Sequence, residues 1–252
     1  MEEKLLVLAK ASPVVSKKYE SLVCIGGITN NGKWRRIYPV PWECFWKTSP
    51  TAFKKKSWIQ YELIDNNPSD HRVESRKINF KSIKPLEEEK YKKIRELIQQ
   101  NLTTLEDLQS KSHREVSLGI IKPEIIDFIE EEADTEKLRN KKAQKTLDMK
   151  DAVPIDIAEK KYSYKFKCGH PNCKGHKLLC EDWELGELYR SCKDYLKRGK
   201  YKDENELFQK IKNKMFDEMK KKEEIFFVVG THYRFDTYII IGILYPKKSD
   251  KF

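Results

Sequence analysis

Short apolar or alternating runs recur along the first 85 residues, and runs of this length are typical of β-strands. They predict strands at Lys4–Ala9, Leu22–Thr29, Lys33–Tyr38, Trp58–Ile64 and Ile78–Ile83. Asn30-Asn31-Gly32 separates the second run from the third, and Asn-Gly favours a hairpin because both residues tolerate positive φ. We therefore expect a small antiparallel barrel.

The period changes to that of a helix after Leu86. Tyr91, Ile94 and Ile98 follow helical spacing, with a break near Asn101. Residues 120–129 are apolar and fit either a helix or a strand. The stretch 130–150 is dense in charge and poor in apolar residues, which predicts an exposed helix or a linker.

The carboxy-terminal part contains both strand-like and helix-like patterns. We expect strands at Tyr162–Cys168, His176–Cys180, Ile225–Val229 and Tyr238–Leu244, a helix from Trp183, and a second helix opened by a capping box at Asp203. The predicted fold class is α+β, with three parts. These are a basic β-rich domain at 1–85, a helical and charged connecting segment at 86–150, and a zinc-knuckle α+β domain at 151–252.

Four potential metal ligands lie within nine residues between two of these strands: Cys168, His170, Cys173 and His176. The intervening Gly, Pro and Asn favour turns, and a tight loop lets sulfur and imidazole ligands reach one tetrahedral zinc. Cys180 could replace His170, but an extended chain places it about 13 Å beyond His176. We therefore predict structural Zn²⁺ on the first four residues. The alternative set with Cys180, which reads Cys-x4-Cys-x2-His-x3-Cys, resembles a retroviral-type zinc knuckle in its ligands, but the spacings differ. The alternative is a pair of buried thiols beside two loop histidines.

The chain carries 51 Lys and Arg against 40 Asp and Glu, a net charge of +11. Residues 1–85 hold 16 Lys and Arg against 8 Asp and Glu, which predicts a polyanionic partner for this part. Bases stack on aromatic rings while phosphates meet cations, so DNA or RNA fits this composition. The expected nucleic-acid contacts are Trp34, Arg36, Tyr38, Lys54, Lys55 and Lys56. The alternative is that the tryptophans fill the core of the barrel.

A second hypothesis is a metal-dependent nuclease. Asp182 and Glu184 follow the cysteine-histidine loop, and His232, Arg234 and Asp236 share a later loop. The order of loop, strand and helix loosely resembles that of ββα-metal nucleases. Asp182 is equally well placed as a helix N-cap, and loss of such a cap costs about 1 kcal/mol of stability. Convergence of the two carboxylates with the later loop would favour an enzyme, and separation would favour a binding protein.

The six cysteines do not form the spacing of a disulfide framework. The start of the sequence lacks the basic and apolar regions of a signal peptide, and the longest apolar run, 238–245, is too short to span a bilayer. We expect a soluble cytoplasmic protein without a membrane partner. The combined interpretation is a zinc-stabilised nucleic-acid-binding protein.

Overall fold

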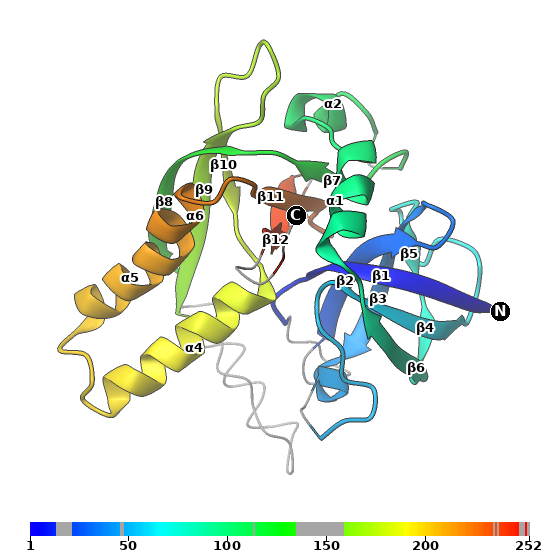
Figure 1. Ribbon diagram of the computed structural model, residues 1–252, viewed down its shortest axis with the longest axis horizontal. Helices are drawn as coiled ribbons and strands as arrows, with labels where there is room; N and C mark the ends of the chain where they lie inside the picture. The colour runs from blue at the N-terminus through cyan, green and yellow to red at the C-terminus, as the bar shows by residue number, and fades with distance from the viewer. Residues whose placement is uncertain are drawn as a thin grey trace.

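A curled, six-stranded sheet forms the amino-terminal part of the computed structural model (Figure 1). The structure describes residues 1–13, 22–45, 48–112, 114–134, 159–233, 235, 237–246 and 250. The strands of the sheet are β1 (Glu2–Lys10), β2 (Leu22–Thr29), β3 (Trp34–Pro41), β4 (Ser57–Leu63), β5 (Ser75–Arg76) and β6 (Ile78–Glu88), in the order β5-β3-β2-β1-β4-β6. Neighbouring strands are antiparallel apart from the short β3–β5 pair. The predicted hairpin joins β2 to β3, with Gly32 at φ +74°.

Two three-stranded antiparallel sheets make up the rest of the strand structure. Their strands are β7 (Leu118–Ile121), β8 (Glu124–Glu132), β9 (Lys160–Lys167), β10 (His176–Leu179), β11 (Phe226–Thr231) and β12 (Tyr238–Leu244). One sheet has the order β10-β9-β8 and the other the order β12-β11-β7. The central segment of the sequence therefore contributes one strand to each of these sheets.

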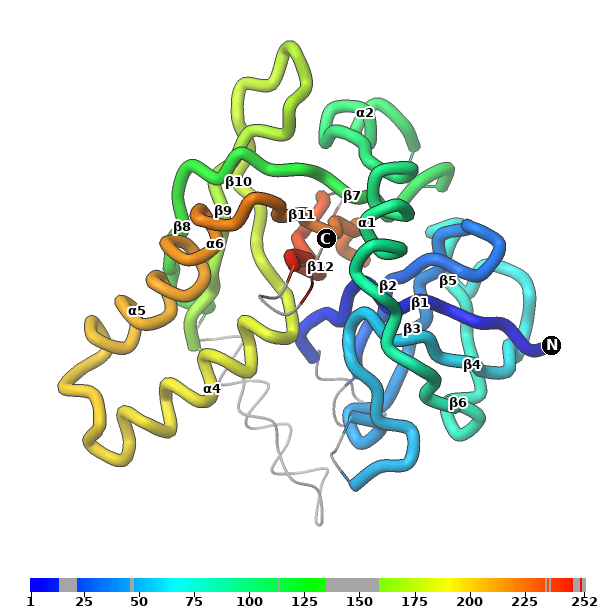
Figure 2. The backbone as a smooth tube through the Cα atoms, viewed as in Figure 1, coloured from blue at the N-terminus to red at the C-terminus, as the bar shows by residue number. Residues whose placement is uncertain are grey.

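The helices are short compared with the sheets. They are α1 (Tyr91–Gln100), α2 (Leu105–Gln109), α4 (Trp183–Lys197), α5 (Glu204–Lys212) and α6 (Glu218–Lys220), with a 3-10 turn at Trp42–Phe45 and a π-helical turn at Asn213–Asp217. Figure 2 shows the amino-terminal sheet at the right, α4 to α6 at the left, and β11 and β12 between them. The fold is α+β and rich in strand. None of the helices described is both long and apolar enough to cross a membrane.

The start of the charge-dense stretch is a strand, where a helix or linker was expected. Glu131 and Glu132 of β8 lie opposite Lys161 and Lys160 of β9, and Tyr162 donates to Glu130. Opposite charges on facing strands stabilise a sheet, so the acidic run is matched by a basic partner strand. Residues 135–158 lie outside the described part of the chain.

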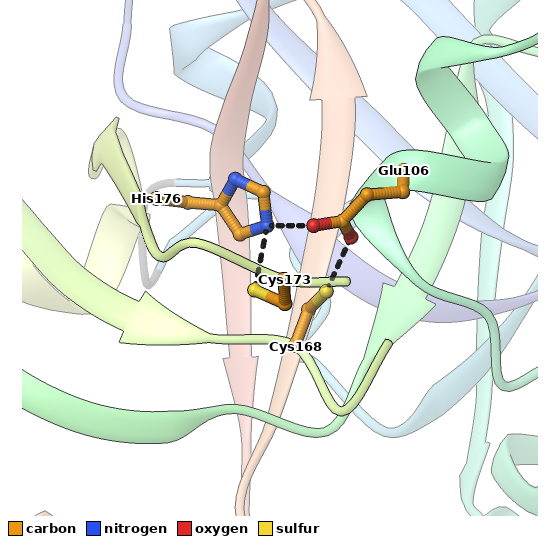
Figure 3. Close-up of side chains that lie close together, drawn as sticks. All are labelled: Glu106, Cys168, Cys173 and His176. Carbon is orange, nitrogen blue, oxygen red and sulfur yellow. Dashed lines mark hydrogen bonds and ion pairs between the residues drawn. The ribbon is translucent and has the colours of Figure 1, made fainter. Parts of the chain in front are cut away.

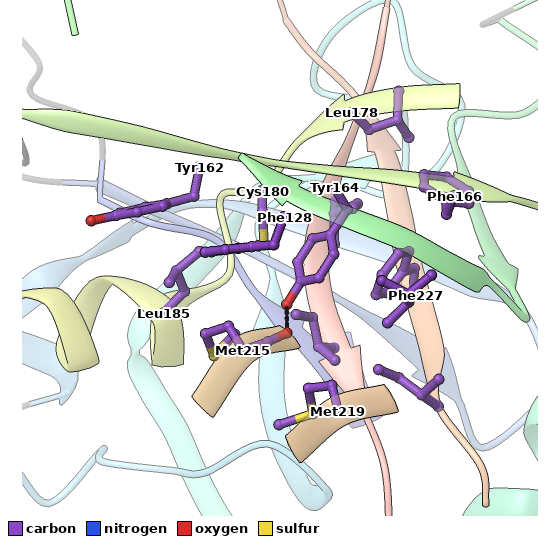
Figure 4. Packing of buried hydrophobic residues seen from close by; sticks show 14 of the residues in the cluster. Phe128, Tyr162, Tyr164, Phe166, Leu178, Cys180, Leu185, Met215, Met219 and Phe227 are labelled. Carbon is purple, nitrogen blue, oxygen red and sulfur yellow. Dashed lines mark hydrogen bonds between the residues drawn. The ribbon is translucent and has the colours of Figure 1, made fainter. Parts of the chain in front are cut away.

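Buried apolar side chains join the sheets into one body. Residues Leu6 and Leu8 of β1 belong to a buried cluster that also contains Leu118 of β7 and Phe226 and Val228 of β11. A second cluster lies inside the amino-terminal sheet. A third packs the face of β8, β9 and β11 against α4 and the α5–α6 region, with many aromatic rings (Figure 4). The amino-terminal sheet thus packs directly on the β12-β11-β7 sheet.

Candidate metal centre

The predicted ligand loop is held by the pairing of β9 with β10. His176, the first residue of β10, lies opposite Phe166 of β9, so the chain reverses direction within residues 168–175. Gly169 and Gly175 take φ of +81° and +95°, values that side chains other than glycine rarely adopt. The backbone N–H of Cys173 donates to the carbonyl of His170 at 3.0 Å. This reversal brings Cys168, Cys173 and His176 to the same end of the hairpin.

A fourth residue joins them from a distant part of the sequence. Glu106 lies in the first turn of α2, whose N-cap Thr104 accepts a hydrogen bond from the N–H of Asp107. One ligand atom from each of Glu106, Cys168, Cys173 and His176 lies within 4.8 Å of the others (Figure 3). These four residues are called the metal centre below.

The separations within the metal centre suit one small cation. His176 Nε2 lies 3.0 Å from Glu106 Oε1 and 3.3 Å from Cys173 Sγ, and Cys168 Sγ lies 2.6 Å from Glu106 Oε2. Tetrahedral zinc holds sulfur, nitrogen and oxygen ligands about 3.4–3.8 Å apart, so a small outward movement would accommodate an ion. Two sulfurs, one imidazole and one carboxylate form a donor set for a borderline-soft divalent metal. The group therefore could hold a metal ion.

Burial and hydrogen bonds together shift the pKa values of Cys168 and Glu106. Burial, followed by the Glu106 carboxylate, raises the pKa of Cys168 to about 11. Burial also opposes ionisation of Glu106, but hydrogen bonds led by that from Cys168 outweigh it and lower the pKa of Glu106. The thiol of Cys168 thus donates to an ionised carboxylate. A bound cation would replace this proton, because a thiolate is the form that binds metal.

His170 and Cys180 lie apart from this group. His170 Nδ1 accepts a hydrogen bond from the N–H of Asn172 at 3.1 Å within the loop. Cys180 is buried where the chain bridges to Ile240 of β12, and burial raises the pKa of its thiol well above the ordinary value. The structure thus brings together three of the four predicted ligands and adds Glu106. That carboxylate lies 62 residues before Cys168, and an acidic residue in a first helical turn is too common to attract notice.

Asp182 is the N-cap of α4 and is also part of a buried ion pair. Its Oδ1 accepts from the N–H of Glu184 at 2.7 Å, as expected for a cap. Its Oδ2 accepts from Lys55 Nζ at 2.7 Å and from the N–H of Ile243 at 2.8 Å. Burial disfavours the charge on Lys55, but Asp182 and Glu184 outweigh it and hold the pKa of Lys55 above its ordinary value. Every one of these contacts of Asp182 is structural.

The later polar loop lies at the other end of β12 from Asp182. The N–H of His232 donates to the carbonyl of Thr237 where the hairpin closes, whereas Asp182 contacts Ile243. Ile243 lies five residues after Tyr238 along the strand, a distance of about 16 Å. The described residues therefore give no convergence of Asp182 with His232. Arg234 and Asp236 lie outside the described residues.

Three of the six predicted nucleic-acid contacts are buried, which corrects their expected exposure. Arg36 is only 2% exposed, and its guanidinium donates to the carbonyl and the Oγ of Ser117. Lys55 and Lys56 are buried, and Lys56 donates to the carbonyl of Tyr245. Arg36 of β3 instead lies beside Ser117, the residue that precedes β7.

The remaining three predicted contacts differ in exposure. Trp34 and Tyr38 are half-buried, and Lys54 is exposed. Trp34 packs against the cluster that joins β1 to β11. Lys54 is thus the exposed cation of the predicted set.

Two protein families match the sequence of this chain. No curated protein matches it. The family described as Domain of unknown function (DUF8758) matches residues 1–104. A second family matches residues 98–252, which is more than half of the sequence. The chain therefore belongs to the family described as Domain of unknown function (DUF8757).

Proposed function

We propose that this protein is a zinc-stabilised, cytoplasmic nucleic-acid-binding protein. The observation that carries the first part is the metal centre, in which a carboxylate and three soft ligands converge from two distant elements. The helix α2 has only five residues, too few to be stable through its own hydrogen bonds. An ion shared by Glu106 and the β9–β10 loop would fasten α2 to the hairpin. The described cysteines are all free, which suits a reducing compartment where ligand thiols persist.

The net charge of +11 supports the second part of the proposal, because non-specific affinity for nucleic acid comes mainly from phosphate contacts. Exposed aromatic rings offer a surface for stacking. Tyr233 and Phe235 are 59% and 63% exposed at the tip of the β11–β12 hairpin. The ring of His71 lies 5.6 Å from that of Tyr233, and the guanidinium of Arg72 lies 5.5 Å from it.

This aromatic surface is held in place by the fold. Arg72 pairs with Asp70 at 2.6 Å and donates to the carbonyl of Thr231 at 3.2 Å, so the loop around His71 is fastened to the hairpin. His232 stacks on Phe235 with centroids 4.8 Å apart. A base stacked on a protein ring contributes about 1–3 kcal/mol to binding, which supports this surface as the contact.

The metal part is tested by a matched pair of histidine variants. We expect the purified protein to contain one zinc ion per chain by elemental analysis. His176→Ala should lose most of the zinc and much thermal stability, because structural zinc contributes directly to the free energy of folding. His170→Ala changes the same loop outside the metal centre and should keep the zinc. Glu106→Ala should resemble His176→Ala. A folded protein without zinc, or zinc lost only in His170→Ala, would contradict the assignment.

The nucleic-acid part is tested by the anisotropy of labelled single-stranded DNA and RNA. Affinity should fall steeply between about 50 and 200 mM salt as counterions return to the phosphates. The double variant Tyr233→Ala/Phe235→Ala should bind at least tenfold more weakly, because it removes two stacking rings. Tyr195→Ala removes an exposed ring from α4 and should bind like the parent. Absence of binding by the parent at low salt would refute this part.

The alternative of a metal-dependent nuclease finds no support in the described residues. Asp182 is buried by the contacts of its cap and ion pair, and the β11–β12 loop lies at the far end of a strand. Asp182 is therefore not open to a catalytic ion, and Asp236 of the later loop lies outside the described residues.

A further inference from the structure

Lys10, the last residue of β1, is one of the residues that line a cavity of about 230 Å³ between the amino-terminal sheet and the start of α4. Trp183, Glu184, Glu187 and Tyr245 also line this cavity. Its volume corresponds to roughly seven water molecules, enough for a small organic ligand. The cavity is separate from the metal centre, which contains none of these residues.

The ammonium group of Lys10 is buried, and few polar groups replace the water that it loses. The residue is 8% exposed, and its Nζ donates to the carbonyl of Phe53 at 3.3 Å. Its Nζ also lies 4.7 Å from the ring centroid of Trp183 and 4.9 Å from that of Phe45. In the described part of the chain, no carboxylate lies within ion-pair distance of Lys10. Rings and one carbonyl replace only part of the hydration that a primary ammonium loses.

A second cation increases the cost of protonating Lys10. Lys55 is held charged nearby by Asp182 at 2.7 Å and Glu184 at 3.1 Å. Burial and then the charge of Lys55 lower the pKa of Lys10 to about 8, although Glu184, Asp182 and Glu187 act in the opposite direction. A lysine desolvated beside another cation is one of the arrangements that activate an amine as a nucleophile.

We propose that Lys10 is a nucleophilic amine that forms an imine with a small aldehyde or ketone bound in the cavity. The neutral amine adds to the carbonyl carbon, the C=O π bond breaks, and the oxygen takes up a proton. The carbinolamine then loses water as the C=N bond forms, so amine and carbonyl give imine and water. Glu184 and Glu187 line the same cavity and can accept and return the protons that move.

The reaction is tested on the intact protein with propanal and sodium cyanoborohydride, which converts an imine to a stable secondary amine. Peptide mass mapping then gives the rate at each lysine. Lys200 is the internal control, because it is exposed and its Nζ also lies over a ring, 4.7 Å from the centroid of Tyr195. At pH 7 we expect Lys10 to be modified at least tenfold faster than Lys200, and its rate to level off above about pH 8.

A Lys10→Arg variant keeps the positive charge and lacks the primary amine. It should lose the rapid modification without transferring it to Lys54, which lines the same cavity and is exposed. Modification of Lys10 no faster than that of Lys200 in the parent would overturn the proposal, whether or not the variant folds. Rapid modification that persists at Lys54 in Lys10→Arg would overturn it as well.

Discussion

At the scale of single residues, Asp182 shows how one carboxylate can connect three elements. It caps α4, pairs with Lys55 before β4, and accepts the backbone N–H of Ile243 in β12. Both charged side chains are nearly inaccessible to water. A buried pair of this kind is often no more stabilising than a well-packed apolar pair, but removal of one partner leaves the other charge buried and uncompensated.

Asp182→Ala should therefore destabilise the protein by about 3–5 kcal/mol, well beyond the ~1 kcal/mol of a helix cap. Urea unfolding of the parent and the variant measures the difference. Asp203→Ala is the matched control, because Asp203 caps α5 through the N–H of Glu206 and is exposed. It should cost about 1 kcal/mol. Adding Lys55→Met to Asp182→Ala should restore part of the loss. If Asp182→Ala and Asp203→Ala lower the free energy of unfolding equally, the ion pair contributes nothing beyond the helix cap.

At the scale of elements, strands and helices were well predicted where pattern and end signals agreed. The run Tyr238–Leu244 is β12 as expected, and the capping residue Asp203 opens α5. The break near Asn101 is the C-cap of α1. These features depend on neighbours within a few residues, which is the range that periodicity and capping describe.

Elements whose form depends on distant partners were harder to predict. The apolar run 120–129 is divided between β7 and β8, which pair with β11 and β9. The acidic residues of β8 pair with basic residues of β9, which is distant in the sequence, so the local pattern of β8 does not reveal this pairing. The same holds for the metal centre. Its loop can be recognised from the local sequence, whereas Glu106 is brought to the loop by the packing of α2.

Burial of cations was the least predictable feature from sequence. Arg36 and Lys55 belong to the basic part of the chain, and a count of charges places both on its surface. Ser117 and Asp182, which lie in the other family region, supply their acceptors instead. A net charge therefore indicates a class of partner, but it does not identify the side chains that meet it.

At the scale of the molecule, the regions matched by the two families share one interior. Arg36 donates to Ser117, Lys55 to Asp182, and Arg72 to Thr231, so three cations of the first region find acceptors in the second. The sheets also approach closely. A Cβ added to Gly242 would lie 2.8 Å from the Cβ of Ala9, so β12 and β1 leave no room for a side chain at this point.

This interior predicts that the two regions do not fold independently. Fragments 1–104 and 98–252 should each be poorly soluble when expressed alone, because each exposes an apolar face that the other covers. The first would also carry Arg36 and Lys55 without their acceptors, and the second would bury Asp182 without its cation.

Co-expression should recover a soluble complex, because the apolar face and the buried ion pair re-form across the break. Circular dichroism with heating measures cooperative unfolding of each fragment, of the complex and of the intact chain. The intact chain and the complex should show one shared transition, with that of the complex at lower temperature because association costs translational entropy. If fragment 98–252 alone unfolds cooperatively near the temperature of the intact chain, the shared interior is not what stabilises it.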